Sequence, residues 1–248
     1  MNRIIKSLFI VMLAVSPWVD AQFRTRDRID NLEGFDNKKY SWGFFLNLNN
    51  YDYKMVLDPT NGIIGNQNAV QSQPTYSFGA GLIGKRRLSE DLDLRLEPGL
   101  QFTERELTFE NARLNAPNPD DTSSYAVRKI KSTYLDIPLL LEYHGWRWYN
   151  SRPYISGGIN WMVNLQSNEG SEDDNQQALF RSTTHNFGWS AEMGIQFYFG
   201  RFKLTPAVRG TFILNNELVA DNPGTPAYWA GSLSGIHSRV FMFILKFE

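Results

Sequence analysis

The segment at residues 132–144, STYLDIPLLLEYH, constrains the fold of this chain more than any other stretch. Its odd positions from 135 to 143 are apolar, whereas its even positions include Asp136, Glu142 and His144. Because successive side chains of a strand point to opposite faces, this period of two predicts a strand with one apolar face. A stave of a membrane β-barrel has such a face, and so does a half-buried strand of a soluble β-sandwich. The stretch alone leaves both interpretations open.

The first 21 residues have the pattern of a secretory signal peptide. Arg3 and Lys6 precede an apolar run at 8–15, and Val19 and Ala21 occupy the −3 and −1 positions of a cleavage site before residue 22. An uncleaved membrane anchor is the alternative, but the run is shorter than a spanning helix requires. Residues 1–21 are therefore left out of the fold prediction.

The composition excludes several classes of protein. Beyond the first residues, no apolar run approaches the ~20 residues of a membrane helix. The chain contains no cysteine, so we expect neither disulfide bonds nor a thiolate metal site. The net charge of −1 lacks the basic excess of a nucleic-acid-binding protein. An exported chain of this kind is either a soluble protein or a barrel in the outer membrane.

The lengths of the connections favour the barrel. Alternating patterns predict eight strands, at 40–49, 75–88, 92–103, 132–144, 154–164, 186–197, 202–212 and 234–247. Short connections at 89–91, 145–152 and 200–201 alternate with long ones at 57–74, 110–130, 166–183 and 214–232. Long structureless loops are uncommon in compact soluble domains, whereas short turns at one end and long loops at the other are typical of outer-membrane barrels. We therefore predict an all-β fold, an eight-stranded antiparallel transmembrane β-barrel over 40–248, with both termini periplasmic.

Aromatic residues fall near both ends of these strands, as expected at the two membrane interfaces. The predicted belt at the short-turn end contains Trp42, Trp146, Trp148, Tyr149, Tyr198, Phe199 and Phe247. The belt at the long-loop end contains Trp161, Phe187, Trp189, Phe212 and Trp229. Strand 234–247 is apolar on both faces, and we favour Phe241, Phe243, Leu245 and Phe247 as outward. Pro98 and Pro206 lie inside strands, where we expect bulges.

The interior of an eight-stranded barrel is just wide enough to be filled by side chains. We expect a lumenal charge network of Asp93, Arg95, Glu97, Asp136, Glu142, Glu192, Lys203 and Arg209. Arg95 should lie beside Glu97 and Asp136, because strands 92–103 and 132–144 are neighbours. Buried charges persist only when they are paired, so structural filling is favoured over an ion or proton path.

No motif for catalysis or for a metal or cofactor site is recognised. His185 and His237 have hydroxyl residues nearby in sequence, but no nucleophile-elbow motif frames a serine. The acidic run around Asp173 and Asp174 matches no defined Ca²⁺ loop, so a solvated loop is expected. The tail at 22–39 contains closely spaced charges of both signs, which predict a solvated segment. We expect no enzyme activity, no cofactor, no metal and no small-molecule substrate.

Four segments together resemble the PorT/SprT family of Bacteroidota. They are NLEGFDNKKYSWGFFLNLNNYDY (31–53), TYLDIPLLLEY (133–143), RPYISGGINWMVNLQSN (152–168) and FKLTPAVRGTFILNN (202–216) with the closing Phe247 and Glu248. The resemblance implies an outer-membrane protein required for type IX protein secretion, and for gliding in species that glide. It implies outer-membrane lipid and other secretion components as partners. Alternatives are a general structural or adhesion barrel and, less favoured, a lipid-modifying barrel enzyme.

If that resemblance holds, the barrel cannot itself be the export pore. Eight strands enclose too narrow a space to pass a folded protein. A role in secretion would then run through the outer wall, the loops or the periplasmic tail. Within the tail we single out Leu32, Phe35 and Asp36 as candidates for binding a partner.

Overall fold

The computed structural model describes residues 30–117 and 122–248. The expected signal peptide at 1–21 and the first part of the tail, 22–29, lie outside the described residues. The strands all belong to one compact unit, Asn31–Glu248. Among the described residues, no helix is both long enough and apolar enough to cross a membrane.

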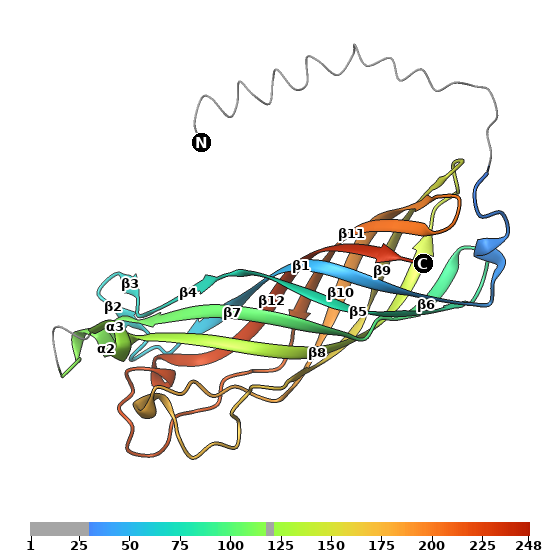
Figure 1. Ribbon diagram of the computed structural model, residues 1–248. Helices are drawn as coiled ribbons and strands as arrows, with labels where there is room; N and C mark the ends of the chain where they lie inside the picture. The colour runs from blue at the N-terminus through green and yellow to red at the C-terminus, as the bar shows by residue number, and fades with distance from the viewer. Residues whose placement is uncertain (1–29, 118–121) are drawn as a thin grey trace, which may run out of the picture. The chain divides into compact units, whose positions relative to one another are not determined.

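Eight antiparallel strands form a closed ring, as predicted (Figure 1). Two of the eight are composite, each made of two segments in line. Around the ring, the strands are β1 (Tyr40–Leu57), β4 (Val70–Pro74) with β5 (Tyr76–Arg87), β6 (Leu92–Leu96) with β7 (Gly99–Phe109), β8 (Val127–His144), β9 (Ser151–Asn164), β10 (His185–Tyr198), β11 (Lys203–Ile213) and β12 (Leu233–Phe247). Pairing of β1 with both β5 and β12 closes the ring, whereas β4 has β7 as its pairing partner within the described sheet.

Long and short connections alternate as predicted, but the long loops contain more structure than expected. Residues 70–74 are strand β4, which pairs with β7, and 127–130 belong to β8. The short elements gather at the end away from the short turns (Figure 1). They are β2 (Ile63–Ile64), β3 (Gln67–Asn68), α2 (Glu110–Leu114), α3 (Thr122–Ala126), η4 (Asn175–Gln177) and η5 (Ala230–Ser232). The loops therefore form a folded cap, which we call the lid.

The bulges expected at the two prolines are absent. Pro98 separates β6 from β7, yet β5 pairs with both segments in a single register. Two bonds bridge the gap: Glu97 N–H donates to Pro138 O at 3.2 Å, and Leu82 N–H donates to Pro98 O at 2.9 Å. The β10–β11 register is likewise the same on both sides of Pro206. A proline has no N–H to donate to a neighbouring strand. At both prolines the sheet lacks a few backbone pairs, but the register between the strands does not change.

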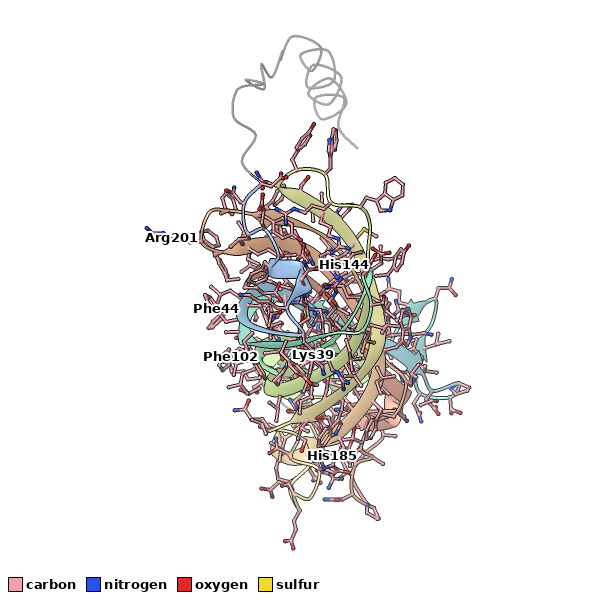
Figure 2. All side chains as sticks on the ribbon, turned by 90° about the vertical axis from the view of Figure 1, so that its right-hand side faces the viewer. Lys39, Phe44, Phe102, His144, His185 and Arg201 are labelled. Carbon is pink, nitrogen blue, oxygen red and sulfur yellow. The ribbon has the colours of Figure 1, made fainter. Side chains whose placement is uncertain are left out.

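The alternation of β8 separates an apolar outer wall from a polar interior. Leu139, Leu141 and Tyr143 are 39%, 45% and 56% exposed, whereas Asp136 and Glu142 are buried. In β12, Phe241 and Phe243 face outward and Met242 between them is buried, which is the phase that we favoured. Figure 2 shows Phe44 and Phe102 on the outside of the ring and His144 within it. Such a continuous exposed apolar wall suits lipid.

Charged pairs mark where the wall leaves the hydrocarbon on the long-loop side. Beyond Phe102, the outward residues of β7 and β8 pair as Glu104 with Lys131 and Glu106 with Lys129, each at 3.9 Å. These partly exposed pairs contribute little to stability. They show that the strands continue past the apolar band.

Two residues assigned to the aromatic belts are instead buried. Tyr198 shares the inward phase of Gln196, and its hydroxyl donates to Asp36 Oδ2 at 2.8 Å. Trp229 lies in the lid, where it packs edge-on against Tyr125 at 4.9 Å. The assignment of Tyr198 was wrong because its position along the strand was considered without the direction of its side chain. The assignment of Trp229 was wrong because this residue lies in a loop that packs into the lid.

Candidate functional site in the barrel lumen

A four-membered ionic cluster fills the middle of the lumen. Glu192 and Arg209 face each other across β10 and β11, with Arg209 Nε 2.8 Å from Glu192 Oε2. Arg209 also pairs with Glu97. From β12, Lys246 Nζ lies 2.8 Å from Glu97 Oε1 and 2.5 Å from Glu192 Oε1. Two carboxylates and two cations thus neutralise one another in a space that their side chains occupy.

Arg95 extends this cluster toward the short turns. Its guanidinium lies 2.8 Å from Glu97 Oε1, 3.1 Å from Glu142 Oε1 and 3.2 Å from Glu248 Oε1. Glu248 in turn pairs with Lys203. The planar guanidinium has five donors, so it can hold several carboxylates together in a way that an ammonium cannot.

Six of the eight residues predicted for the charge network lie in this connected group: Arg95, Glu97, Glu142, Glu192, Lys203 and Arg209. Among the described residues, Asp93 is linked to this group through His144 alone. Asp136 lies apart from Arg95, contrary to our expectation, and accepts from Asn160 Nδ2 at 2.7 Å. The register explains the separation, because Arg95 is opposite Leu140 whereas Asp136 is opposite Gly99.

Sequence reasoning missed several members of the interior. Lys246 stands between outward Leu245 and Phe247, so the favoured phase of β12 already implied that it points inward. Lys85 shares the inward set of β5 and lies 3.1 Å from Asp93 Oδ2. Glu248 follows the last strand and has the parity of Lys246, so the same phase also indicated an inward position for it.

A separate arginine occupies the lumen beneath the lid. Arg105 donates to Tyr134 Oη at 2.8 Å and to Ser238 Oγ at 3.0 Å. Its guanidinium lies 3.8 Å from the centre of the Tyr53 ring, within the range of a cation–π contact. Ser238 Oγ donates to Glu217 Oε2 at 3.0 Å, which links the arginine to a carboxylate from the lid.

The lid has its own apolar core, which seals the lumen at the long-loop end. Its buried residues come from β1, β4, β7, β8, β12 and the long loops: Tyr53, Ala69, Val70, Leu107, Phe109, Ala112, Ala126, Ile130, Phe180, Trp229, Leu233 and Ile236. Trp229 Nε1 donates to Tyr125 O at 3.0 Å. The loops are thus packed against one another and against the strand ends.

Asp174 joins two of these loops and is not the solvated residue that we expected. Its carboxylate accepts from Gln176 N at 2.9 Å, from Asn222 N at 2.8 Å and from Thr225 Oγ1 at 2.7 Å. Burial raises the pKa of Asp174, but these hydrogen bonds outweigh burial and hold it below its ordinary value. Burial raises the pKa of the neighbouring Asp221.

At the short-turn end, the described part of the tail packs onto the barrel. Asn31 N–H donates to Asn150 Oδ1 at 2.8 Å. Asp36 accepts from Tyr198 and lies 3.7 Å from Arg147 and 3.8 Å from Arg152. Leu32 and Phe35 are half-buried. The expectation of a solvated tail is therefore wrong for Asn31, Leu32, Phe35 and Asp36, whereas Glu33 and Gly34 are exposed.

The hydroxyls near the rim histidines are engaged elsewhere. Ser182 Oγ accepts from Asn164 Nδ2 at 3.1 Å, and Ser238 bonds Glu217 and Arg105. His185 faces outward and stacks on Trp161, with ring centres 6.0 Å apart. Within residues 30–117 and 122–248, neither His185 nor His237 forms a hydrogen bond with a hydroxyl group.

A closed antiparallel ring with an apolar wall and a charged interior defines an outer-membrane β-barrel. The chain belongs to the outer membrane protein beta-barrel domain family, whose model matches residues 21–219. That family resides in the outer membrane of Gram-negative bacteria, with lipid around the wall.

Solved barrels resemble the chain at low identity. Neisserial surface protein A is 10% identical over 84% of this chain and 98% of that chain, with a TM-score of 0.44. OprG from Pseudomonas aeruginosa is 12% identical over 83% and 93%, with a TM-score of 0.43. Ail, the attachment invasion locus protein of Yersinia pestis, is 8% identical over 85% and 99%, with a TM-score of 0.39. No curated protein sequence matches the chain.

Proposed function

We propose that the protein is a non-conducting, non-catalytic outer-membrane barrel that acts by binding other molecules. The observation that carries this proposal is the filled lumen. The cluster of Arg209, Glu192, Glu97 and Lys246 occupies its middle, and the lid core closes one end. A solute would have to break buried ion pairs to pass, and breaking such pairs is costly.

A conductance measurement tests the closed lumen. The refolded protein in planar bilayers should show no stable single-channel steps. A matched variant, Arg209→Ala with Lys246→Ala, empties the middle of the lumen and serves as the positive comparison. Steady ion conductance by the unaltered protein would contradict the proposal.

The specific role that we propose is a component of type IX secretion. Its support is the resemblance of four segments, in order, to the PorT/SprT family, and one of these segments includes residues 31–36. Deleting the gene should stop export of type IX cargo, which would accumulate unprocessed in the periplasm, while other outer-membrane proteins remain in place. Normal cargo export in the deletion strain would remove this role.

A structural or adhesion barrel is the second candidate, and the folded lid favours it. Loops with their own buried core present a fixed surface, whereas unstructured loops would not. Under this candidate, cargo export is unaffected by the deletion, and cell-surface attachment or envelope integrity changes instead. The two readouts separate the candidates in one strain.

Both candidates place the lid outside the cell and the termini in the periplasm. Cysteines introduced at Asn115 and Asn222, both on the long-loop side, should react with an impermeant reagent on intact cells. A cysteine at Glu90, in a short turn, should react only after the outer membrane is opened. The reverse pattern would overturn the orientation.

A further inference from the structure

A histidine and two carboxylates converge at the short-turn end of the lumen. Glu142 and His144 are two residues apart on β8 and so share its inner face, and Asp93 is directly opposite Glu142 on β6. His144 Nε2 lies 2.8 Å from Asp93 Oδ2 and 3.2 Å from Glu142 Oε1. One ligand atom from each of the three residues lies within 4.8 Å of the others.

The hydrogen bonds of this group are incomplete. Glu142 Oε1 accepts from Arg95 and Gln196, whereas Glu142 Oε2 has no partner among the residues that the structure describes, although the side chain is fully buried. His144 Nδ1 faces Gln196 Nε2 at a long 3.4 Å. A buried carboxylate oxygen without a partner is costly, and a bound cation would satisfy it.

The donors suit one class of ion. One imidazole nitrogen with two carboxylate oxygens is a ligand set of Zn²⁺, which binds such atoms at about 2.0–2.2 Å and can keep one position open. The two donor pairs are 2.8 and 3.2 Å apart. An ion about 2.1 Å from both atoms of such a pair would have a donor–ion–donor angle of roughly 90°. A separation larger by a few tenths of an ångström would give a tetrahedral angle, within reach of side-chain adjustment.

Lys85 is the competitor for this position. Its ammonium lies 3.1 Å from the same Asp93 oxygen that faces His144. Asp93 and Lys85 each retain about 5% exposure, whereas Glu142 has none, so the group opens toward the short-turn end. An ion entering from that end would displace Lys85 from Asp93.

We propose that Asp93, Glu142 and His144 form a Zn²⁺ site at the short-turn mouth of the barrel, with Lys85 as its competing cation. The sequence did not predict this site, because Asp93 lies 51 residues before His144 and the β6–β8 pairing brings it beside Glu142 and His144. The bound ion would cross-link β6 to β8. This inference is independent of the binding role proposed above.

Equilibrium dialysis with Zn²⁺ alone, on the full chain refolded in detergent and treated with EDTA, tests the site. The unaltered protein should bind one Zn²⁺ per chain. His144→Gln should weaken binding at least tenfold, and Lys85→Met should tighten it severalfold. A variant with His185→Gln and His237→Gln, which removes the other two histidines of the chain, should bind as the unaltered protein does.

The two lumenal variants, His144→Gln and Lys85→Met, are expected to change the Zn²⁺ affinity in opposite directions, so a general loss of structure cannot explain both results. Heat-modifiable migration in gels verifies that each variant is folded, and Glu142→Gln replaces His144→Gln if the latter does not fold. Absence of stoichiometric binding, or equal affinity in the unaltered protein and His144→Gln, would overturn the site. Unchanged affinity in Lys85→Met would overturn the competing role of Lys85. Co²⁺ substitution should give an absorption spectrum of mixed nitrogen and oxygen ligation that is lost in His144→Gln.

Discussion

Arg209 and Glu192 face each other across β10 and β11 and are joined by two contacts, at 2.8 and 2.6 Å, with both side chains buried. The same arginine reaches Glu97 on the far side of the lumen. One side chain therefore ties three strands together through the barrel interior.

Arg209→Leu should destabilise the barrel strongly. Among the described residues, Glu192 would keep only Lys246 as an ion-pair partner and Glu97 would keep Lys246 and Arg95. Truncating one partner of a buried ion pair costs roughly 3–5 kcal/mol. Heat-modifiable migration in detergent gels should shift to lower temperature. Arg201→Leu is the matched control, because Arg201 lies exposed in a short turn and projects away from the ring (Figure 2). Equal transitions for both variants would contradict the role of the cluster.

Leu96→Arg tests the lipid-facing phase of β6. Leu96 is 44% exposed on the outer wall, and an arginine near the bilayer midplane costs about 2–4 kcal/mol. Val56→Arg, near the long-loop end of β1, should cost only about 0–1 kcal/mol, since the penalty falls toward the interface. Refolding equilibria in lipid vesicles measure both costs. A larger cost at Val56 than at Leu96 would contradict this position of the apolar band along the strands.

Trp229→Ala should loosen the lid while the barrel stays folded. The fully buried indole packs on Tyr125, and a core Trp-to-Ala change typically costs about 3–5 kcal/mol. Limited proteolysis should cleave the long loops faster, with little change in the heat transition of the barrel. Trp146→Ala, at a 90% exposed site, should leave the loops protected. Unchanged protection in Trp229→Ala would mean that the loops hold together without this core.

The lid should weaken in acid through Asp174. Because its pKa is lower in the folded lid than in the unfolded chain, its contribution is present above a pH of about 4. That contribution is lost as the pH falls through the folded pKa. In Asp174→Asn, protection of the loops from an acid protease should be weaker at pH 5 and should fall less below pH 4. Asp173→Asn, at the exposed neighbouring position, should behave as the unaltered protein does.

Replacing Leu32 and Phe35 with Ser tests the tail. Both side chains are half-buried at the short-turn end, so the change should free the tail locally without unfolding the ring. If the tail presents a partner site, cargo secretion should fall although the barrel assembles. Glu33→Ser, which alters an exposed position in the same segment, is the control. Normal secretion by the double variant would remove the tail from the proposal.

The fold was largely predictable because strand alternation acts locally. In β8, each residue from Leu139 to His144 faces the side that its parity indicates. The closed ring followed from the connection lengths. The identity of individual contacts did not follow, because they depend on register between strands. Asp136 shows this, since a four-residue offset along β8 separates it from Leu140, the residue opposite Arg95.

Features built from loops were beyond the reach of the sequence. The burial of Trp229 and Asp174 depends on how separate loops pack, which no local period encodes. Arg105 was missed because the predicted third strand ended at residue 103, whereas β7 continues to Phe109. The hydrogen bond from Tyr198 to Asp36 could not be predicted without knowing that Tyr198 points inward at the end of β10.

The length of the strands has a consequence for where the lid meets its surroundings. β1 and β8 each run for 18 residues. At about 3.4 Å per residue and a tilt of about 45°, such a strand rises roughly 43 Å, whereas the apolar band of these barrels is about 25 Å tall. On the long-loop side, part of the wall, including the Glu104–Lys131 pair, therefore extends beyond the apolar band. A large molecule approaching from that side could touch the lid without parting the lipids at all.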